Sequence, residues 1–415
     1  MKIAVIGSGI SGLSAAYLLD RVHDVTVFEK EDYLGGHART VMVRPDGADA
    51  DIPVDTGFIV FNYRNYPLLA QLFAELDVPV QKSDMSFGLT VDEGWLEYGT
   101  PKIWNVFAQK RNIARRAFWR MMGDVLRFYR QSPRFLERGT EFTLGECLDE
   151  LGMGSWFRQY YLMPMGAAIW SCPPETMLSF PATTFIRFFM NHGLLTLNDQ
   201  PQWYTVTNRS KTYVNNILQK ISGEHYKNYA VNKIKRNLNG LQVYYGDDNE
   251  FFSYDKVIIA THADDALKLI DSPLEEEIKI LSNFKYKKNI AYIHFDESIM
   301  PKNKKNWCSW NSSVDKLNVN NNAITYWLNL LQNLKVDKNI FLTLNPYLKI
   351  DEEKIFKKVT FTHPYYDQNT LNNQKNLLKI QNKNSILFCG SYFGYGFHED
   401  GIKSSIEMIK KLYDK

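Results

Sequence analysis

The chain has 415 residues, of which 45% are hydrophobic, 14% aromatic and 23% charged, as in a globular protein with a sizeable core. Its length predicts two or three domains. The formal net charge of +3 is too small to indicate binding to nucleic acid, and no run approaches the roughly 18 apolar residues of a membrane span. The high aromatic content favours a large core or a pocket for a flat or apolar ligand.

The cysteines and the N-terminus indicate a cellular compartment. The cysteines lie far apart without a CxxC pair, which is typical of a reduced protein and of neither a disulfide scaffold nor a zinc site. The apolar start lacks the cationic region and cleavage site of a signal peptide. We therefore expect a cytoplasmic protein whose membrane contact, if any, is peripheral and on the inner face of the membrane. The cysteines are Cys147, Cys172, Cys308 and Cys389.

The first residues predict a nucleotide-binding unit. Lys2–Ile6 is a short apolar run typical of a buried parallel strand, Leu13–Leu19 has the pattern of a helix, and Val25–Phe28 that of a second strand. Between the first strand and the helix lies a GxGxxG motif. A glycine-rich turn without a ligand is the alternative, but every element of the dinucleotide fingerprint is present.

The spacing of this motif has a physical basis. Gly7 permits the tight turn, Gly9 lets the backbone approach a pyrophosphate, and Gly12 lets helix and strand pack closely. The N-terminus of the helix then offers free N–H groups to the phosphates. Glu29, at the end of the second strand, is expected to accept hydrogen bonds from ribose hydroxyls, and its charge disfavours the 2′-phosphate of NADP.

A second motif indicates which dinucleotide binds. Gly35-Gly36 follows Glu29, and "PVDTGFIVF" runs from residue 53 to 61. The pair of motifs resembles the flavoprotein superfamily of amine oxidases, phytoene desaturases and protoporphyrinogen oxidase. The resemblance implies that FAD is the cofactor, that the glycine pair contacts it, and that the strand after it brings an aspartate and a glycine beside the flavin. Many members have arginine after the glycine pair, where this chain has His37, with Arg39 and Thr40 nearby.

The middle of the chain predicts a separate domain rich in apolar residues. Tyr66–Leu76 reads as a helix, the pattern around Asp92-Glu93-Gly94 as a hairpin, and Thr143–Leu151 as a helix with a capping box. Residues 156–203 are unusually apolar and aromatic, so they form a core, line a pocket for a long apolar substrate, or both. Trp307, Trp310, Tyr326 and Trp327 are candidate pocket walls.

Residues 102–138 are strongly basic, with ten Lys or Arg against two acids. Aromatic residues are interleaved at helical spacing, which predicts a pair of amphipathic helices. One interpretation is contact with an anionic membrane or an acidic substrate. The other is a helix pair with a core face and a solvated basic face.

The chain returns to the cofactor unit after residue 205. Alternating segments up to the strand Lys256–Ala260 predict a β-meander that rejoins the sheet. The resemblance implies that a strand near Val231 flanks the adenine and that the strand ending at Ala260 and Thr261 runs beside FAD. Further strands are expected around Ile290–Phe295, and beyond it around residues 323–328 and 340–344.

The C-terminus predicts a strand at Ile386–Cys389, a glycine-aromatic loop, and a helix from Gly401. The resemblance implies that this helix points at the N1–C2=O edge of the flavin, where negative charge accumulates on reduction. Three consecutive residues, His398-Glu399-Asp400, point in different directions, so we predict no metal site there.

These observations together predict an α/β fold. A Rossmann-like FAD-binding domain, with a parallel sheet and a β-meander, comprises residues 1–80, 205–270 and 379–415. An inserted α+β substrate domain, as in amine oxidases, comprises residues 81–204 and 271–378. The residues predicted to bind FAD are Gly7, Gly9, Ile10, Ser11, Gly12, Glu29, Lys30, Gly35, Gly36, His37, Thr40, Thr56, Gly57, Phe58, Val231, Ala260, Thr261, Gly390, Ser391, Gly401 and Ile402.

Longer motifs, among them "SDMSFG", "MPMGAAIWSCPPE" and "GYGFHEDGIKS", resemble one bacterial subfamily of these flavoproteins, associated with cyclopropane-fatty-acid-synthase-type methyltransferases. The resemblance implies an apolar, fatty-acyl or phospholipid substrate that is desaturated. Isomerisation of a double bond, or a non-catalytic role as a methyltransferase partner, are the alternatives. The lysine that amine oxidases often place near the flavin cannot be identified. Candidate catalytic residues are His398, Tyr395, His192 and Asn191.

Overall fold

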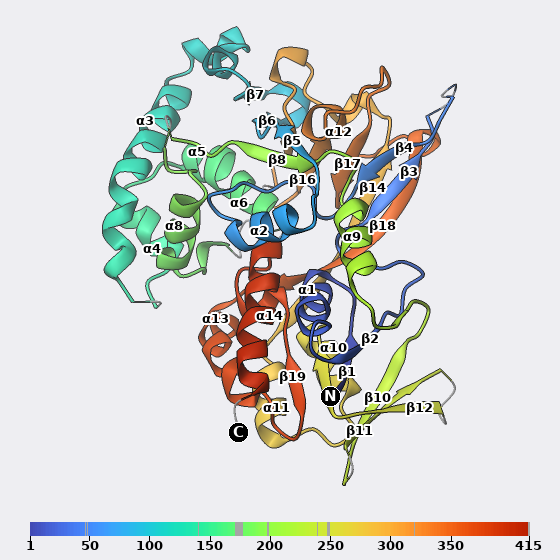
Figure 1. Ribbon diagram of the computed structural model, residues 1–415. Coiled ribbons are helices and arrows are strands. Elements are labelled where there is room, and N and C mark those ends of the chain that lie inside the picture. Colours follow the sequence, from blue (N-terminus) through green and yellow to red (C-terminus); the bar gives the residue numbers. More distant parts are fainter. Residues whose placement is uncertain are drawn as a thin grey trace.

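The structure, a computed structural model, has two parts between which the chain passes several times (Figure 1). It describes residues 1–45, 47, 49–139, 141–170, 177–196, 199–238, 240–246, 250–318 and 320–413. The described cysteines, Cys147, Cys308 and Cys389, are buried and unpaired, and Cys172 lies outside the described residues.

A five-stranded parallel sheet forms the centre of the lower part in Figure 1, in the order β19-β13-β1-β2-β9. Its strands are β1 (Lys2–Ile6), β2 (Asp24–Phe28), β9 (His225–Tyr226), β13 (Lys256–Ile259) and β19 (Ile386–Phe388). The helices against it are α1 (Ile10–Leu19), α9 (Lys211–Lys220), α10 (Ala263–Leu269), α11 (Glu275–Leu281) and α14 (His398–Leu412).

Successive residues of β1 point to opposite faces of this sheet, and each face is buried in a core of its own. Ile3 and Val5 pack with α1, α9 and α14, whereas Ala4 and Ile6 pack with α10, α11 and a three-stranded antiparallel sheet. Burial on both faces explains why β1 is a continuous apolar run. The three-stranded sheet consists of β10 (Val231–Asn237), β11 (Gly240–Tyr245) and β12 (Glu250–Tyr254).

The upper part is built on a seven-stranded sheet in the order β18-β14-β17-β16-β15-β6-β7, antiparallel except where β15 meets β6. The strands are β6 (Phe87–Val91), β7 (Leu96–Gly99), β14 (Lys285–His294), β15 (Trp310–Val314), β16 (Asn322–Trp327), β17 (Phe341–Leu344) and β18 (Ile355–Tyr365). Two-stranded sheets pair β3 (Thr40–Val43) with β4 (Ile52–Asp55), and β5 (Val80–Ser83) with β8 (Trp203–Val206).

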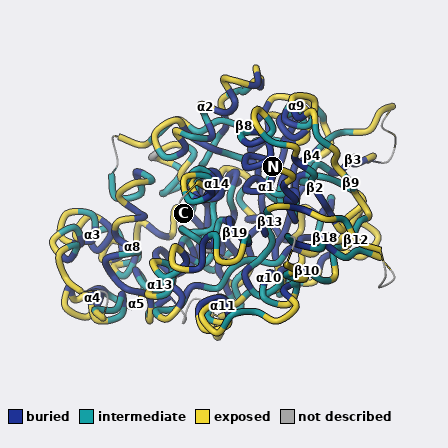
Figure 2. The backbone as a smooth tube through the Cα atoms, turned by 60° about the horizontal axis from the view of Figure 1, so that its bottom comes forward, coloured by how far each residue is buried: buried dark blue, intermediate teal, exposed yellow. Residues whose placement is uncertain are grey.

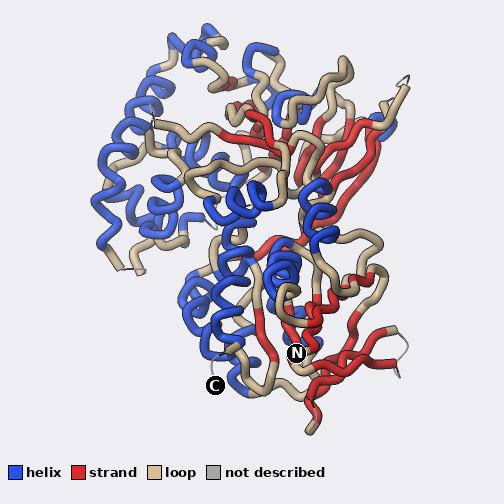
Figure 3. The backbone as a smooth tube through the Cα atoms, viewed as in Figure 1, coloured by secondary structure: helices blue, strands red, loops and turns tan. Residues whose placement is uncertain are grey.

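Helices occupy the side of the upper part away from most of its strands (Figure 3). They share a core with β6 and β7, built largely from Phe, Tyr, Leu and Met side chains. The remaining helices are α2 (Pro67–Glu75), α3 (Arg116–Gln131), α4 (Leu144–Glu150), α5 (Ser155–Phe157), α6 (Met163–Trp170), α8 (Ala182–Asn191), α12 (Leu328–Leu331) and α13 (Gln368–Gln374).

The predicted α/β fold is confirmed, and three local predictions are corrected. Residues 102–138 contain one α-helix, α3, flanked by 3-10 helices, and not a helix pair; α3 ends just before Pro133, which has no N–H to continue it. The helix expected from Leu13 begins at Ile10. The helix expected from Gly401 begins at His398, because the acidic side chains of residues 399 and 400 suit a helix N-terminus.

Every strand of the parallel sheet comes from the ranges predicted for the FAD-binding domain, and every strand of the seven-stranded sheet from those predicted for the substrate domain. Around the predicted boundaries, however, Ile280, Leu281 and Leu377 pack in the same core as Ile6 and Val257. The boundaries themselves stay a prediction. In the part of the chain that the structure describes, no helix is both long and apolar enough to cross a membrane.

Replacing the helical glycines Gly12 and Gly123 by alanine should have opposite effects on the free energy of unfolding. A Cβ on Gly12 would lie 1.9 Å from the carbonyl oxygen of Gly7, whereas one on Gly123 would meet nothing within 4 Å. We expect Gly12→Ala to lower the free energy of unfolding by about 3 kcal/mol or to prevent folding. Gly123→Ala should raise it by about 0.5–1 kcal/mol. Urea denaturation measures both, and equal effects would contradict the close packing of α1 on β1.

Candidate active site

A cavity of about 710 Å³ lies between the parallel sheet and the seven-stranded sheet. On one side it is lined by the residues that follow β1, β2, β13 and β19, and on the other by residues of β6, β15, β16, β17 and β18 together with α6 and α8. Its size is within the range of cofactor and ligand sites. The carboxyl ends of parallel strands are also where open α/β sheets bind ligands.

Most of the residues predicted to bind FAD line this cavity. The glycine loop, the end of β2 and the glycine loop after β19 contribute backbone, and the segment after β4 contributes side chains. The predicted residues that line it are Gly7, Gly9, Ile10, Ser11, Glu29, Lys30, Gly36, His37, Thr56, Gly57, Phe58, Val231, Ala260, Thr261, Gly390 and Ser391.

Gly12, Gly35, Thr40, Gly401 and Ile402 do not line the cavity, and several have structural contacts instead. A Cβ on Gly401 would lie 2.7 Å from Ser11 Oγ, so this glycine lets α14 approach α1 closely. Ile402 is buried in the core between these helices. Thr40 Oγ1 donates a hydrogen bond to Asp55 Oδ1 at 2.7 Å, behind the cavity wall.

Glu29 is held at the end of β2 by hydrogen bonds from the glycine loop. Its Oε2 accepts from Ser8 N at 3.0 Å and from Ser8 Oγ at 2.6 Å, and its Oε1 accepts from Glu31 N at 3.1 Å. The carboxylate is therefore fixed where the resemblance implies a ribose. The sequence analysis missed Ser8, which stands between the first two motif glycines and also lines the cavity.

The lining fits a dinucleotide. A Cβ on Gly9 would meet nothing within 4 Å, which leaves open space above the loop that the motif assigns to a pyrophosphate. Four lining side chains carry a buried polar atom that has no hydrogen-bond partner among the described residues. Buried polar atoms are normally paired, so these are available to a ligand. They are His37 Nε2, Trp310 Nε1, Tyr366 Oη and Tyr392 Oη.

His398, the first residue of α14, lines the cavity. Its ring stacks on Phe58 with centroids 3.9 Å apart, and Nε2 lies 3.0 Å from Tyr213 Oη. Burial lowers the pKa of His398 to about 3, and it raises the pKa of Tyr213 well above the usual value. The imidazole is therefore neutral, and its Nε2 shares a hydrogen bond with the Tyr213 hydroxyl.

The two acids beside His398 bond backbone groups of other segments. Glu399 accepts hydrogen bonds from Leu68 N at 2.9 Å and Leu69 N at 3.0 Å, which caps the N-terminus of α2. Asp400 Oδ2 accepts from Tyr395 N at 2.9 Å and from the backbone N–H of residue 397 at 3.0 Å, which closes the glycine loop. His398, Glu399 and Asp400 thus contact three different parts of the structure.

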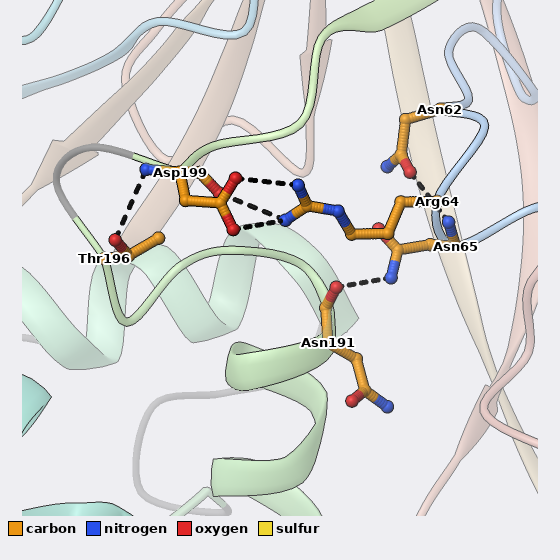
Figure 4. A network of polar contacts seen from close by, with 6 residues as sticks. All are labelled: Asn62, Arg64, Asn65, Asn191, Thr196 and Asp199. Carbon is orange, nitrogen blue, oxygen red and sulfur yellow. Dashed lines mark hydrogen bonds and ion pairs between the residues drawn. The ribbon is translucent and has the colours of Figure 1, made fainter.

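The other predicted catalytic residues lie in different places. Tyr395 and His192 line the cavity, and His192 stacks on Phe188 with centroids 3.8 Å apart. Asn191 is exposed at the end of α8 and does not line the cavity. Figure 4 shows that its backbone carbonyl, not its side chain, accepts a hydrogen bond from Asn65. Nearby, an ion pair between Arg64 and Asp199 at 2.8 Å joins the same two segments (Figure 4).

Of the described residues, His262, Asp264 and Asp265 come close enough to one another to be considered for a metal. The Lys268 ammonium bonds both carboxylates, at 3.3 Å and 2.9 Å, and supplies their counter-charge. We therefore assign no metal to this group.

Of the four residues proposed as pocket walls, two line the cavity and two do not. Trp310 and Tyr326 line the cavity, with rings 4.7 Å apart. Trp307 and Trp327 do not; they pack in a small core with Phe341. The alternation of β16 accounts for the division, because Tyr326 and Trp327 are adjacent and point to opposite faces.

Residues 10–333 match the family described as flavin containing amine oxidoreductase. The chain belongs to this family. Its cofactor is FAD, and the protein is a FAD-dependent oxidoreductase. The chain matches no curated protein sequence.

Solved structures of low sequence identity share the family fold from end to end. A CLA-producing fatty acid isomerase from P. acnes has a TM-score of 0.68 and 12% identity, over 99% of this chain and 98% of that chain. Cyclohexylamine oxidase from Brevibacterium oxydans IH-35A has a TM-score of 0.67 and 14% identity, over 99% of both chains. A putrescine oxidase bound to putrescine has a TM-score of 0.67 and 14% identity, over 100% of both chains.

The stability of this flavoenzyme should depend on the buried carboxyl of Asp400. Burial raises its pKa from 3.8 to about 6, so between these values the folded protein binds a proton that the unfolded chain has lost. The contribution of Asp400 to stability therefore falls as the pH rises through this window and is constant above it. The free energy of unfolding of the wild type minus that of Asp400→Asn should fall by about 1.4 kcal/mol per pH unit there.

Denaturation at a series of pH values measures this difference. Asp315→Asn is the matched control, because hydrogen bonds, first of all from Asn321, lower the pKa of the exposed Asp315 carboxyl. Its difference should stay level between pH 3.8 and 6, and should rise with pH only below about 3.8. Parallel profiles for the wild type and Asp400→Asn would contradict a buried, protonated Asp400.

Proposed function

We propose that this oxidoreductase desaturates an apolar chain, such as that of a fatty acid or phospholipid: two C–H bonds on adjacent carbons break, one hydrogen leaves as a hydride and the other as a proton released to solvent, and a C=C bond forms. The observation that carries the proposal is that, among the described residues, no Asp, Glu, Lys or Arg side chain lines the cavity wall opposite the glycine loops. Beside Thr362 and His363 of β18, which are polar, the side chains there are aliphatic, aromatic or thioether groups, an environment that favours hydrocarbon. They are Ile59, Val60, Met85, Phe87, Met165, Ala168, Ile169, Leu194, Trp310, Tyr326, Leu331, Leu344 and Phe361.

The distribution of charge disfavours an amine substrate. Among the lining residues, the permanently charged side chains are Glu29, Lys30, Asp265 and Lys268, which all follow strands of the parallel sheet. A substrate ammonium ion at the opposite wall would be buried without a counter-charge, at a cost of several kcal/mol. The histidines of the cavity do not add charge, because burial lowers the pKa of His192 and holds that of His398 at about 3.

FAD, when bound, supplies a two-electron acceptor for the hydride. The chain's own groups position the substrate and exclude water. Phe58 and His398 form a stacked pair at the cavity wall, and Tyr213 holds the imidazole in one orientation by its hydrogen bond to Nε2.

Isomerisation of a double bond is the second candidate. The similarity in fold to a structure described as a CLA-producing fatty acid isomerase supports it. The same apolar wall suits both reactions, which differ in whether the hydride returns to the chain. We also propose, on the resemblance of its motifs, that the protein belongs to the subfamily associated with cyclopropane-fatty-acid-synthase-type methyltransferases.

Anaerobic mixing of the FAD-loaded protein with fatty acids and phospholipids, both saturated and unsaturated, tests the proposal. Bleaching of the flavin and loss of two hydrogens from the product, measured by mass spectrometry, are expected for desaturation. Unchanged mass with a displaced double bond indicates isomerisation. Bleaching by amines but by no lipid would overturn the proposal.

A carboxylate placed in the apolar wall should impair turnover. Met165, on α6, lines the cavity, whereas Met190, on α8, is 43% exposed and does not. With the lipid substrate so identified, we expect Met165→Glu to lower kcat/KM at least about tenfold, because the new charge is buried without a partner. Met190→Glu, the control, should stay within about twofold of the wild type. If amines are the true substrates, Met165→Glu would instead improve their binding.

A further inference from the structure

The most distinctive surface feature outside the cavity is residues 102–138, here called the basic arm. It carries ten Lys or Arg and two acids, whereas the whole chain has a formal net charge of only +3, so the rest of the chain is net acidic. Its α-helix, α3, lies at the edge of the molecule in Figure 1, and Figure 2 shows exposed backbone along it. The positive charge of the protein is thus concentrated on one protruding element.

The two faces of α3 differ. Phe118, Met121, Val125 and Phe128 are buried in the core that the helix shares with β6 and β7. The exposed residues recur at the helical spacing on the other face, which combines arginine with two large apolar side chains. They are Arg116, Trp119, Arg120, Gly123, Leu126, Arg127, Arg130 and Gln131.

Apolar groups of the basic arm remain exposed to solvent and continue beyond α3. Trp104 is 66% exposed, Ile113 51%, Trp119 49% and Leu126 40%. Trp119 donates from Nε1 to the carbonyl oxygen of Ile113 at 2.8 Å, and its ring lies 5.4 Å from that of Phe107. These contacts join the 3-10 helices at residues 103–114 to α3 in one surface.

Several cations on this surface have no ion-pair partner among the described residues, although Arg111 donates a hydrogen bond to the carbonyl oxygen of Gly94. Arg127 pairs with the buried Asp124 at 2.8 Å, and Arg138 pairs with Glu150 at 3.1 Å. Within the described residues, no carboxylate forms an ion pair with the remaining exposed cations of α3 and the turn before it. These are Lys110, Arg111, Arg116, Arg120 and Arg130.

We propose that the basic arm docks the protein on the surface of an anionic lipid bilayer. Unpaired arginines attract anionic head groups, and exposed tryptophan with aliphatic side chains inserts at the boundary between head groups and acyl chains. Nucleic acid would match the charge but would leave the exposed Ile113 and Leu126 without a partner. The proposed function gives such docking a purpose, because a phospholipid acyl chain is found there, but the docking itself requires no turnover.

Vesicles of phosphatidylcholine, with and without phosphatidylglycerol, test this proposal with the FAD-loaded protein in a sedimentation assay. Binding should require phosphatidylglycerol and weaken as salt is added. The variant Arg116→Gln, Arg120→Gln, Arg130→Gln should bind about 100-fold more weakly, since each basic residue near the membrane contributes about a fivefold factor. Trp104→Ser with Trp119→Ser should weaken binding while leaving the charge unchanged.

The matched control, Lys235→Gln, Lys279→Gln, Lys410→Gln, removes three exposed cations from elements around the parallel sheet and should bind like the wild type. Equal binding by the arginine variant and this control, or tighter binding of the arm to duplex DNA than to vesicles, would overturn the proposal. The arginine variant should oxidise a detergent-dispersed substrate at the wild-type rate. Failure of docking and failure of the proposed function therefore give separate results.

A chain of hydrogen bonds behind the cavity carries a second inference. The backbone N–H of Ile290 donates to Asn345 Oδ1 at 2.9 Å, so the Asn345 amide nitrogen faces Asn289 and donates to its Oδ1 at 2.7 Å. Asn289 Nδ2 in turn lies 2.8 Å from His363 Nδ1 and 3.4 Å from the carbonyl oxygen of Lys287, which can only accept. The hydrogen bonds on both sides of Asn289 therefore orient its amide as a donor to His363.

The geometry points to His363 as a neutral hydrogen-bond donor to the ligand of this cavity. Because Nδ1 accepts from Asn289, the ring proton lies on Nε2. His363 lines the cavity, and its ring centroid lies 5.3 Å from that of His37. Asn289 and Asn345 act through His363 and are positioning residues.

The nitrogen spectrum of histidine-labelled, FAD-loaded protein identifies the protonated ring nitrogen directly. We expect Nε2 of His363 in the wild type, and protonation at Nδ1 would overturn the inference. Asn289→Asp offers only acceptors, so it should move the proton to Nδ1 and weaken FAD binding about tenfold, the effect of one lost hydrogen bond. Asn372→Asp, at an exposed asparagine of α13, is the control and should change neither. Unchanged FAD affinity in Asn289→Asp with the proton moved would also overturn the inference.

Discussion

The buried carboxylate of Asp55 joins the segments that frame the cavity. It accepts hydrogen bonds from Thr40 Oγ1 at 2.7 Å, from Ser210 N at 2.8 Å and from Ser210 Oγ at 2.6 Å, which fixes the β3–β4 hairpin to the start of α9. Its backbone exchanges two hydrogen bonds, of 3.0 Å and 2.8 Å, with the side-chain amide of Gln332, the residue after α12. The lining residues 56–58 follow immediately, so this junction sets where the cavity wall stands.

Such junctions explain how a cofactor unit made of separate stretches of chain keeps a defined shape. Burial raises the pKa of Asp55 to about 6, which shows that the carboxylate is held at an electrostatic cost. Hydrogen bonds offset this cost, and breaking one would leave a buried group unpaired, at about 1–3 kcal/mol. Glu399 and Asp400 join parts of the chain in the same way, because each accepts hydrogen bonds from backbone N–H groups of another segment or loop. Long insertions between the segments add little further entropic cost, since closure entropy grows only slowly with loop length.

The sequence predicted those features that depend on local pattern. The glycine motif, the strands of the parallel sheet and the capping box of Thr143 and Glu146 are local, and the structure contains each of them. Ser8 was missed because its role appears only when β1 and β2 are adjacent. His363 was missed because its neighbours, Asn289 and Asn345, come from other strands. The helix pair predicted at residues 102–138 failed because periodicity alone does not distinguish an α-helix from successive 3-10 turns.

Charged and apolar side chains line different walls of the cavity. Among the described residues that line the cavity, Asp, Glu and Lys side chains follow strands of the parallel sheet, beside the place expected for the polar dinucleotide, and the opposite wall carries none. An apolar wall discriminates weakly between substrates, about 1–3 kcal/mol for each methylene. On the proposed function, selection among lipids would depend on the length and shape of the cavity, and on which chains are delivered to it. A basic surface outside the cavity could influence delivery without placing a charge where the hydrocarbon would lie.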